Sequence, residues 1–376
     1  MNSNQHTGDT VANSNWERYR YGVERGHLAY VNQAAKCERF YLGGGKQWDD
    51  ADRAQLESEG RPALEANEIM PALNSAIGYQ IHNRMDIAFR PRKNVTQALA
   101  DLRSKMAMQI ADNNKLHWTE TSVFTDGMIE QRGYYDVRMA FDTNVLGELP
   151  ITDLDPRDVI PDPDAKSYDP AKWGDVIVTR WLSLDDIEAL YGRKVRDKVE
   201  QFHGDDGEQD FGEGADDGGD DGERNKFGDN NTSGNAYYIW SMKEGGINRY
   251  RVVDRQRFVY EMADVVVGQY GDIHVITDRN QDAIAAELAN GGTQTKRMTR
   301  RVKWTVTTRY VTLLDKISPY DRFTVVPFFP YFRRGKTRGM VDNAIDPQQI
   351  INKSLSQFAH ILNSSANSGW TVEQGS

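Results

Sequence analysis

The chain has 376 residues, enough for two or three domains with a sizeable core. Its single cysteine, Cys37, excludes an intrachain disulfide framework and a cysteine-based zinc site, and it indicates a reducing compartment. The formal net charge of −10 is local, because residues 205–223 hold ten acidic and no basic residues, and the remainder balances 46 acidic against 46 basic.

No stretch approaches the roughly 18 consecutive apolar residues of a membrane span. The first fifteen residues lack the basic and apolar regions of a signal peptide. We therefore expect a protein that is neither exported by a classical signal nor embedded in a membrane. The neutral balance outside the acidic stretch leaves a nucleic-acid partner possible.

Apolar residues recur at helical spacing in the first third of the chain. The predicted helices cover residues 16–40, 67–84, 96–112 and 117–133. Asn15 is the expected N-cap of the first helix. The third helix is expected to turn Leu99, Leu102, Met106 and Ile110 inward. A short strand is expected over 86–90.

The segment Gly43-Gly44-Gly45-Lys46-Gln47 has some likeness to a phosphate-binding loop. A P-loop requires a hydroxyl after the lysine and a strand before the glycines, whereas Gln47 and a predicted helix occupy these places. We interpret the segment as a helix C-cap and turn. Cys37 is interpreted as a small core residue, and His82 and His117 as isolated histidines without metal-ligand spacing.

Residues 134–178 are rich in strand-forming residues. Five aspartates at 153, 155, 158, 162 and 164 suggest a metal site, but three prolines interrupt them and the calcium-loop offsets are absent, which favours a loop. A helix follows, with Ser183 as cap, Asp186 in the capping box and Gly192 past its end. The acidic low-complexity segment 204–234 cannot bury enough apolar surface to order itself, so we expect a dispensable, poorly ordered insertion.

Alternation resumes over 236–277, and residues 282–290 are predicted to form a short helix. The main basic cluster of the chain comes next, followed by a period-two strand over 302–310. Its members are Lys296, Arg297, Arg300, Arg301 and Lys303. Basic residues at the start of a strand have two equally good explanations here. They form either a solvated strand edge that prevents aggregation or a surface that docks a partner or contacts phosphate.

A second basic turn, Arg333-Arg334-Gly335-Lys336, precedes the clearest helix start in the sequence. Asp346 is the expected cap, Pro347 the first helical residue and Gln349 the capping-box partner, so the helix is predicted over 347–363. Its apolar stripe is expected to pack against another helix, within or between subunits. The stripe consists of Ile351, Leu355, Phe358 and Leu362. The opposite, polar face carries Lys353, Ser356, Gln357 and Asn363.

Three stretches resemble segments of tailed-phage portal proteins, specifically the P22-like portals of short-tailed phages. GMVDNAIDPQQIINKSLSQFAHILNS resembles the start of the second long stem helix, and TVVPFFPYFRRGKTRG the end of the clip. KQWDDADRAQLESEGRPALEANEIMPALNSAIGYQIHNRMDIAFRPR resembles the N-terminal wing signature. The resemblance covers residues 16–363 and depends on the order and spacing of these motifs.

The resemblance implies an α/β chain of the α+β type with the portal fold: a helix-and-strand wing, a helical stem and a small β-rich clip. The implied domains are the wing at 1–277, containing the acidic insertion 204–234, the first stem helix region at 278–298, the clip at 299–340, and the second stem helix with a return to the wing at 341–376. Family members continue into the rest of the wing, a crown and a barrel, so we expect this chain to be truncated.

The implied function is a ring, usually of twelve copies, at one capsid vertex, through which DNA is packaged and ejected. The implied partners are double-stranded DNA, the terminase large subunit, head completion or tail adaptor proteins, and the capsid or scaffolding protein, in a virion assembled in the bacterial cytoplasm. No cofactor or metal is expected, because ATP hydrolysis belongs to the terminase. A tail adaptor or a nucleic-acid enzyme are the alternative functions.

Overall fold

The computed structural model describes residues 9–84, 87–91, 96–141, 144–145, 147–203, 240–244, 247–268, 271, 273–276 and 281–365. The acidic segment 204–234 therefore lies outside the described residues. The chain forms two compact units, each made from two separate stretches: 1–25 with 158–324, and 26–157 with 325–376. These limits differ from the expected wing, stem and clip limits, and that assignment remains a prediction. The mixture of helices and antiparallel strands confirms the α+β class.

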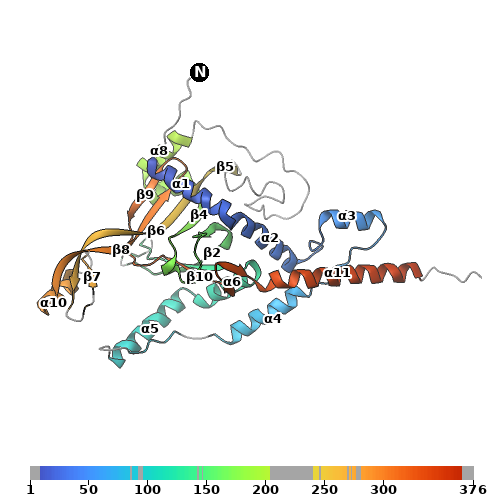
Figure 1. The fold of residues 1–376 in the computed structure, drawn as a ribbon, viewed down its shortest axis with the longest axis horizontal. Helices are drawn as coiled ribbons and strands as arrows, with labels where there is room; N and C mark the ends of the chain where they lie inside the picture. Colours follow the sequence, from blue (N-terminus) through green and yellow to red (C-terminus); the bar gives the residue numbers. More distant parts are fainter. Residues whose placement is uncertain are drawn as a thin grey trace, which may run out of the picture. The chain divides into compact units, whose positions relative to one another are not determined.

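The first unit is organised around β6 (Ile247–Val267), the long central strand of an antiparallel sheet (Figure 1). The sheet order is β3 (Val159–Pro161), β4 (Asp175–Ser183), β6, β8 (Thr293–Thr307) and β9 (Thr312–Ile317), with β5 (Ser241–Glu244) and β7 (Ile273–Val275) also paired to β6. The strand predicted over 302–310 thus begins nine residues earlier, because pairing with β6 satisfies its backbone without an apolar alternation.

Helices cover both faces of this sheet. On one face, α7 (Leu184–Tyr191) and α8 (Arg193–His203) share a core with Tyr250, Val252 and Val306. On the other face, α1 (Thr10–Gly22) lies over odd-numbered residues of β6, where Asn15 donates to the Val253 carbonyl at 3.3 Å. The capping box of Ser183 and Asp186 is formed as predicted, and Gly192 follows the end of α7.

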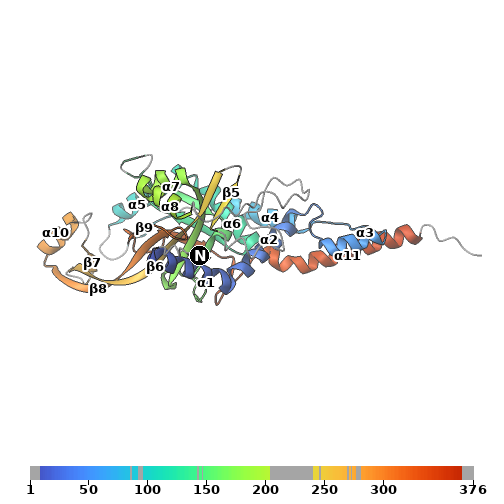
Figure 2. The ribbon, with the colours of Figure 1, turned by 90° about the horizontal axis from the view of Figure 1, so that it is seen from above.

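Beyond Arg257, β6 leaves β4, while its pairing with β8 continues to Val267. The two strands form a ribbon that ends at β7 and α10 (Gln281–Ala289), which Figure 2 shows from above. The helix predicted over 282–290 is confirmed within one residue. Within the expected stem-helix region 278–298, residues 293–298 belong to β8 rather than to a helix.

The predicted helix over 16–40 is wrong in its extent, because it is interrupted. α1 ends at Gly22, a π-helical turn occupies Val23–His27, and α2 covers Leu28–Leu42. Gly26 has a φ of 133°, which side-chain-bearing residues rarely adopt. Asp9, not Asn15, caps α1 by accepting the Val11 N–H at 3.1 Å. Asn15 is instead buried inside the helix and donates to the Thr307 hydroxyl at 2.9 Å.

The second unit has a core shared by α2, α4 (Ile69–His82), α6 (Leu116–Glu130) and α11 (Met340–Ser365). Cys37, Phe40, Leu73 and Val341 are among its most buried residues. This unit also contains two small sheets. One has three strands in the order β10 (Val325–Phe328), β1 (Gly133–Val137) and β2 (Ile151–Leu154), and the other is a hairpin of β11 (Tyr331–Arg333) and β12 (Lys336–Arg338). α3 (Asp50–Ser58) follows the glycine turn at 43–45, whose three positive φ angles confirm the predicted turn.

α11 begins at Met340, so the predicted start at Pro347 is wrong. A proline inside a helix costs about 3 kcal/mol, since it removes one hydrogen bond and clashes with the preceding turn. Val341 and Ile345 are 0% and 3% exposed in the core, and each such burial contributes about 1.5–3 kcal/mol. Packing of the first turns therefore outweighs the local stop signal.

α5 (Gln97–Asn113) has the predicted cap, with the Thr96 hydroxyl accepting the Leu99 N–H. Its predicted inward stripe is wrong, because Leu99, Leu102 and Met106 are exposed and Ala100 is its buried residue. Burial is decided by the small face that meets α6, not by the wider apolar stripe. Residues 87–90 are irregular instead of a strand, and Asp86 lies outside the described residues.

Candidate partner-binding surfaces

The five predicted basic residues of β8 fall on two faces of the strand, because successive side chains alternate. Arg297, Arg301 and Lys303 share the face that bears α1, whereas Lys296 and Arg300 lie on the other. The structure therefore separates a cluster that is continuous in the sequence.

The environments of these cations differ. The Arg300 guanidinium lies 3.7 Å from the Phe258 ring centroid and donates to the Ala171 carbonyl at 2.7 Å. Lys303 pairs with Asp315 at 2.8 Å. Arg301, half-buried, has no hydrogen-bond or ion-pair partner among the described residues. Arg301 is thus available to a partner, whereas Arg300 and Lys303 already make contacts within the first unit.

The second predicted basic group lies on the β11–β12 hairpin. Arg333 stands opposite Lys336 in the register of the two strands, so Arg334 and Gly335 form a two-residue turn. Both turn residues have positive φ angles, of 52° and 83°. Arg333, Arg334 and Lys336 are exposed. They belong to the second unit and the β8 residues to the first, so the expected clustering of the two groups remains a prediction.

Sequence reasoning missed two arginines of β6. Arg255 and Arg257 line a groove with Lys303 of β8 and with Thr10 and Ser14 of α1. The groove has a volume of about 180 Å³, and its other lining residues are Val11, Asn15 and Thr305. The sequence has arginine at 249, 251, 255 and 257, a spacing that places these side chains on one face of a strand. Only the sheet register reveals that residues of β8 and α1 line the same groove.

A buried ion network stands behind this groove. Asp175 accepts hydrogen bonds from Arg18 at 2.7 Å and from Arg255 at 2.8 Å. Burial raises the pKa of Asp175, but these two arginines outweigh it and hold that pKa below its usual range. Burial lowers the pKa of Arg255, and the positive charges of Arg257 and Arg18 lower it further. Asp175 acts in the opposite direction and raises this pKa. The network fixes Arg255 while Arg257 stays outside it.

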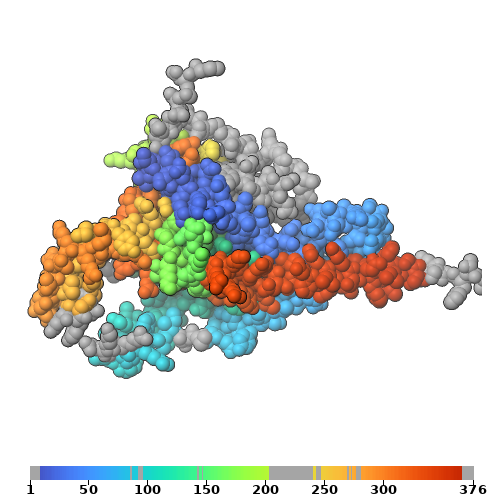
Figure 3. Space-filling model, viewed as in Figure 1, coloured from blue at the N-terminus to red at the C-terminus, as the bar shows by residue number. Residues whose placement is uncertain are grey.

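The predicted packing of the α11 stripe within the chain is wrong. Ile351, Leu355, Phe358 and Leu362 are 37%, 39%, 60% and 51% exposed. Figure 3 shows α11, in red, uncovered along the face in view. The buried face of this helix is the one that carries Gln348, Asn352 and Ser356. The stripe remains available for packing between subunits, which stays a prediction.

The polar buried face of α11 binds an extended segment, residues 64–68, which we call the strap. Ser356 accepts the Leu64 N–H at 2.9 Å, Asn352 the Ala66 N–H at 3.1 Å and Gln348 the Glu68 N–H at 3.0 Å. Asn352 also donates to the Gln47 side chain at 2.7 Å. These contacts satisfy backbone donors that no sheet or helix satisfies, which explains why polar residues occupy the buried face.

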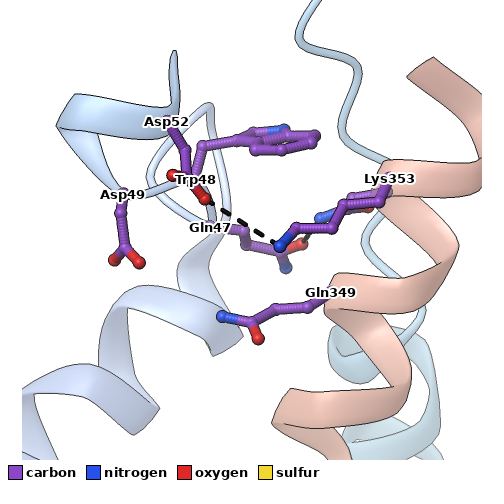
Figure 4. A pocket seen from close by; sticks show the side chains of 7 residues that line it. Gln47, Trp48, Asp49, Asp52, Gln349 and Lys353 are labelled. Atoms are coloured by element: carbon purple, nitrogen blue, oxygen red, sulfur yellow. Dashed lines mark hydrogen bonds and ion pairs between the residues drawn. The ribbon is translucent and has the colours of Figure 1, made fainter. Parts of the chain in front are cut away.

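A small hollow lies beside the strap, between α3 and α11 (Figure 4). Lys353 reaches toward Asp52 across it, with 3.9 Å between the charged atoms, and Gln47 and Gln349 lie below. Its volume of about 10 Å³ corresponds to roughly one water molecule. We therefore interpret it as part of the packing rather than as a ligand site.

Acidic side chains gather around Arg157 in the second unit. Arg157 binds both Glu38 and Glu130. Burial raises the pKa of Asp126 to about 7, and Asp153 and Asp155 add to the effect. Burial also raises the pKa of Glu130 to about 7, although Arg157 opposes it. Two carboxyl groups therefore titrate near neutrality inside this cluster.

Other candidate chemistry is limited in the part of the chain that the structure describes. It contains no group of three or more His, Cys, Asp or Glu side chains placed to hold a metal ion. Cys37 is fully buried, and burial raises the pKa of its thiol to about 12, which favours the unreactive thiol. No helix in the described ranges combines the length and apolarity needed to cross a membrane.

Comparison with protein-family models gives a match over nearly the whole chain. A family model described as Phage P22-like portal protein matches residues 16–376. The matched range includes the β6–β8 ribbon, the β11–β12 hairpin and α11. No curated protein sequence matches the chain. The family match is therefore the finding that bears on function.

Proposed function

Because the chain belongs to the phage P22-like portal protein family, we propose that it forms the ring through which DNA is packaged into one capsid vertex and later ejected. The observation that carries this proposal is the family match over 16–376, which includes nearly the whole chain. The family makes the protein a phage connector of the virion, assembled as an oligomeric ring. The number of subunits, which we propose to be twelve, and the route of the DNA go beyond the family assignment.

We infer further partners from the same membership. The ring would bind the terminase large subunit during packaging, and head completion or tail adaptor proteins afterwards. It would also contact the capsid or scaffolding protein. The basic residues Arg301, Arg333, Arg334 and Lys336 support a docking role, because they project without partners among the described residues. We propose no catalytic role for the chain.

The exposed stripe of α11 supports assembly through this helix. Four apolar side chains on one helix face are costly to leave in water, and burying each fully contributes about 1.5–3 kcal/mol. We propose that the stripe packs against a helix of a neighbouring subunit. In a closed ring the contact recurs once per subunit, so even a modest interface is repeated around the assembly.

Electron microscopy of the purified protein, combined with mass photometry, tests the proposal. We expect rings with a central channel and a mass that is a multiple of the 42.7 kDa chain, with twelve as the expected multiple. A protein that stays monomeric at every concentration, or that forms open filaments, would contradict it. A tail adaptor ring would be separated from a portal ring by its failure to bind the terminase large subunit.

A further inference from the structure

We propose that the groove between α1 and the β6–β8 strands is a binding site for a phosphate-type oxyanion. Its lining includes three cations, Arg255, Arg257 and Lys303, and the hydroxyl groups of Thr10 and Ser14. These are the donor types that proteins use to hold phosphate oxygens. The inference depends on the first unit alone and does not rest on the proposed ring function.

The sheet register forces like charges together at this groove. Arg257 stands directly opposite Lys303 in the β6–β8 pairing. The Cβ atoms of such a pair are about 4.5–5.5 Å apart, and like charges at this position destabilise a sheet. Lys303 is partly neutralised by Asp315, and Arg255 by Asp175. Arg257 remains uncompensated, and a bound anion would remove this repulsion.

The free donors of the groove lie on both of its walls. Arg257 on the sheet, and Ser14 and Thr10 on the helix, have no hydrogen-bond or ion-pair partner within the described ranges. The first turn of α1 adds the positive end of the helix dipole to that wall, partly offset by its cap Asp9. An oxyanion is the ligand that can accept from both walls at once.

The dimensions and the remaining charges favour a small anion. A volume of about 180 Å³ is many times the roughly 10–15 Å³ that a cavity needs to hold one water, and it is sufficient for a phosphate group. The carboxylates that pair with the other two cations are already engaged, since Asp175 binds Arg18 and Arg255, and Asp315 binds Lys303 and Thr305. They therefore do not compete fully for Arg257.

Titration of the full chain with inorganic phosphate at constant ionic strength, followed by calorimetry, tests the site. Loss of one charge-assisted contact is expected to weaken binding about tenfold or more. We expect Arg257→Gln to show this loss. Ser14→Ala should show a smaller loss, because it removes a neutral hydrogen-bond donor instead of a charged one. Alanine is also compatible with this exposed helix position, so folding should be unaffected. Arg297→Gln, which removes the same charge from the same pair of strands outside the groove, should change binding less than twofold.

The phosphate can come from DNA or from free anion, and a second measurement separates the sources. Binding of a short duplex is measured as a function of salt. If DNA phosphate occupies the groove, Arg257→Gln reduces the slope of log affinity against log salt by about one. An unchanged slope, together with lost phosphate binding, assigns the groove to free anion. Absence of phosphate binding by the unmodified chain, or equal losses in Arg257→Gln and Arg297→Gln, overturns the proposal.

Discussion

At the scale of single residues, the carboxyl groups around Arg157 make stability depend on pH. The pKa values of Asp126 and Glu130 are raised to about 7 in the folded chain, whereas ordinary carboxyl groups titrate near 4. The unfolded chain therefore loses these protons at lower pH than the folded one. Stability from this source is fully present below about pH 4 and is lost as the pH rises toward 7.

Asp126→Asn keeps the shape of the side chain but cannot ionise. We expect it to raise the free energy of unfolding at pH 8 by a few kcal/mol, since one pKa unit corresponds to about 1.4 kcal/mol, and to have little effect at pH 4. Chemical denaturation at the two pH values measures this. Asp112→Asn, an exposed change in the same unit, is the control. Equal effects of Asp126→Asn at both pH values would contradict the assignment.

The two neighbouring arginines of β8 are expected to respond differently to charge reversal. Arg301→Glu removes a cation that has no partner in the described structure, so it should weaken terminase or adaptor docking and leave folding unchanged. Arg300→Glu also removes a ring contact with Phe258 and should lower the melting temperature as well. Pull-down with the terminase large subunit, beside thermal melting, measures both. Docking that is unaffected by Arg301→Glu would remove β8 from the interface.

At the scale of elements, the strap depends on the polar face of α11. Asn352→Leu keeps a similar volume but leaves the buried backbone N–H of Ala66 and the side-chain carbonyl of Gln47 without these partners. Each unpaired group costs about 1–3 kcal/mol, so we expect a loss of about 2–6 kcal/mol in the free energy of unfolding. Ser354→Leu places the same residue on the exposed face and should stay within about 0.5 kcal/mol. Similar denaturation midpoints for the two variants would show that the strap bonds are weak.

Local signals predicted the elements whose formation depends on neighbours in sequence. The Ser183 capping box, the Thr96 cap and the turn at 43–45 each require side chains and backbone within a few residues, and each is observed. The start of α11 could not be predicted in this way. Its first turns form because Val341 and Ile345 reach a core contributed by other helices, which overrides the signal at Pro347.

The sequence pattern also could not decide which face of a helix is buried. The apolar stripes of α5 and α11 were recognised, but all of their residues except the half-buried Ile110 are exposed in the chain. Gln348 and Asn352 are buried because the strap needs acceptors, and strap and helix are about 280 residues apart. The groove at Arg257 was missed for a similar reason, because it requires the register of two strands and the position of α1.

At the scale of the whole molecule, Phe358 separates folding from assembly. It is 60% exposed in the chain, so Phe358→Ala should change the melting of the monomer little. If the stripe is buried between subunits, the same change should cost on the order of 3–5 kcal/mol per contact and abolish rings. Asn363→Ala, an exposed polar position outside the stripe, is the control. Ring yield by electron microscopy decides, and an unchanged yield for Phe358→Ala would place the ring contact elsewhere.

The strap has a further consequence for how the length of this chain can change. Four residues of α11 rise about 6.0 Å, and two residues of extended chain span about 6.6 Å, so every fourth helical side chain meets every second strap amide. Deleting one residue between Leu64 and Glu68 turns the remaining amides away from their acceptors. Length changes should therefore survive only when two strap residues and four helical residues change together. Two stretches almost 300 positions apart thus constrain each other's length, because an insertion or deletion in one disrupts its hydrogen bonds with the other.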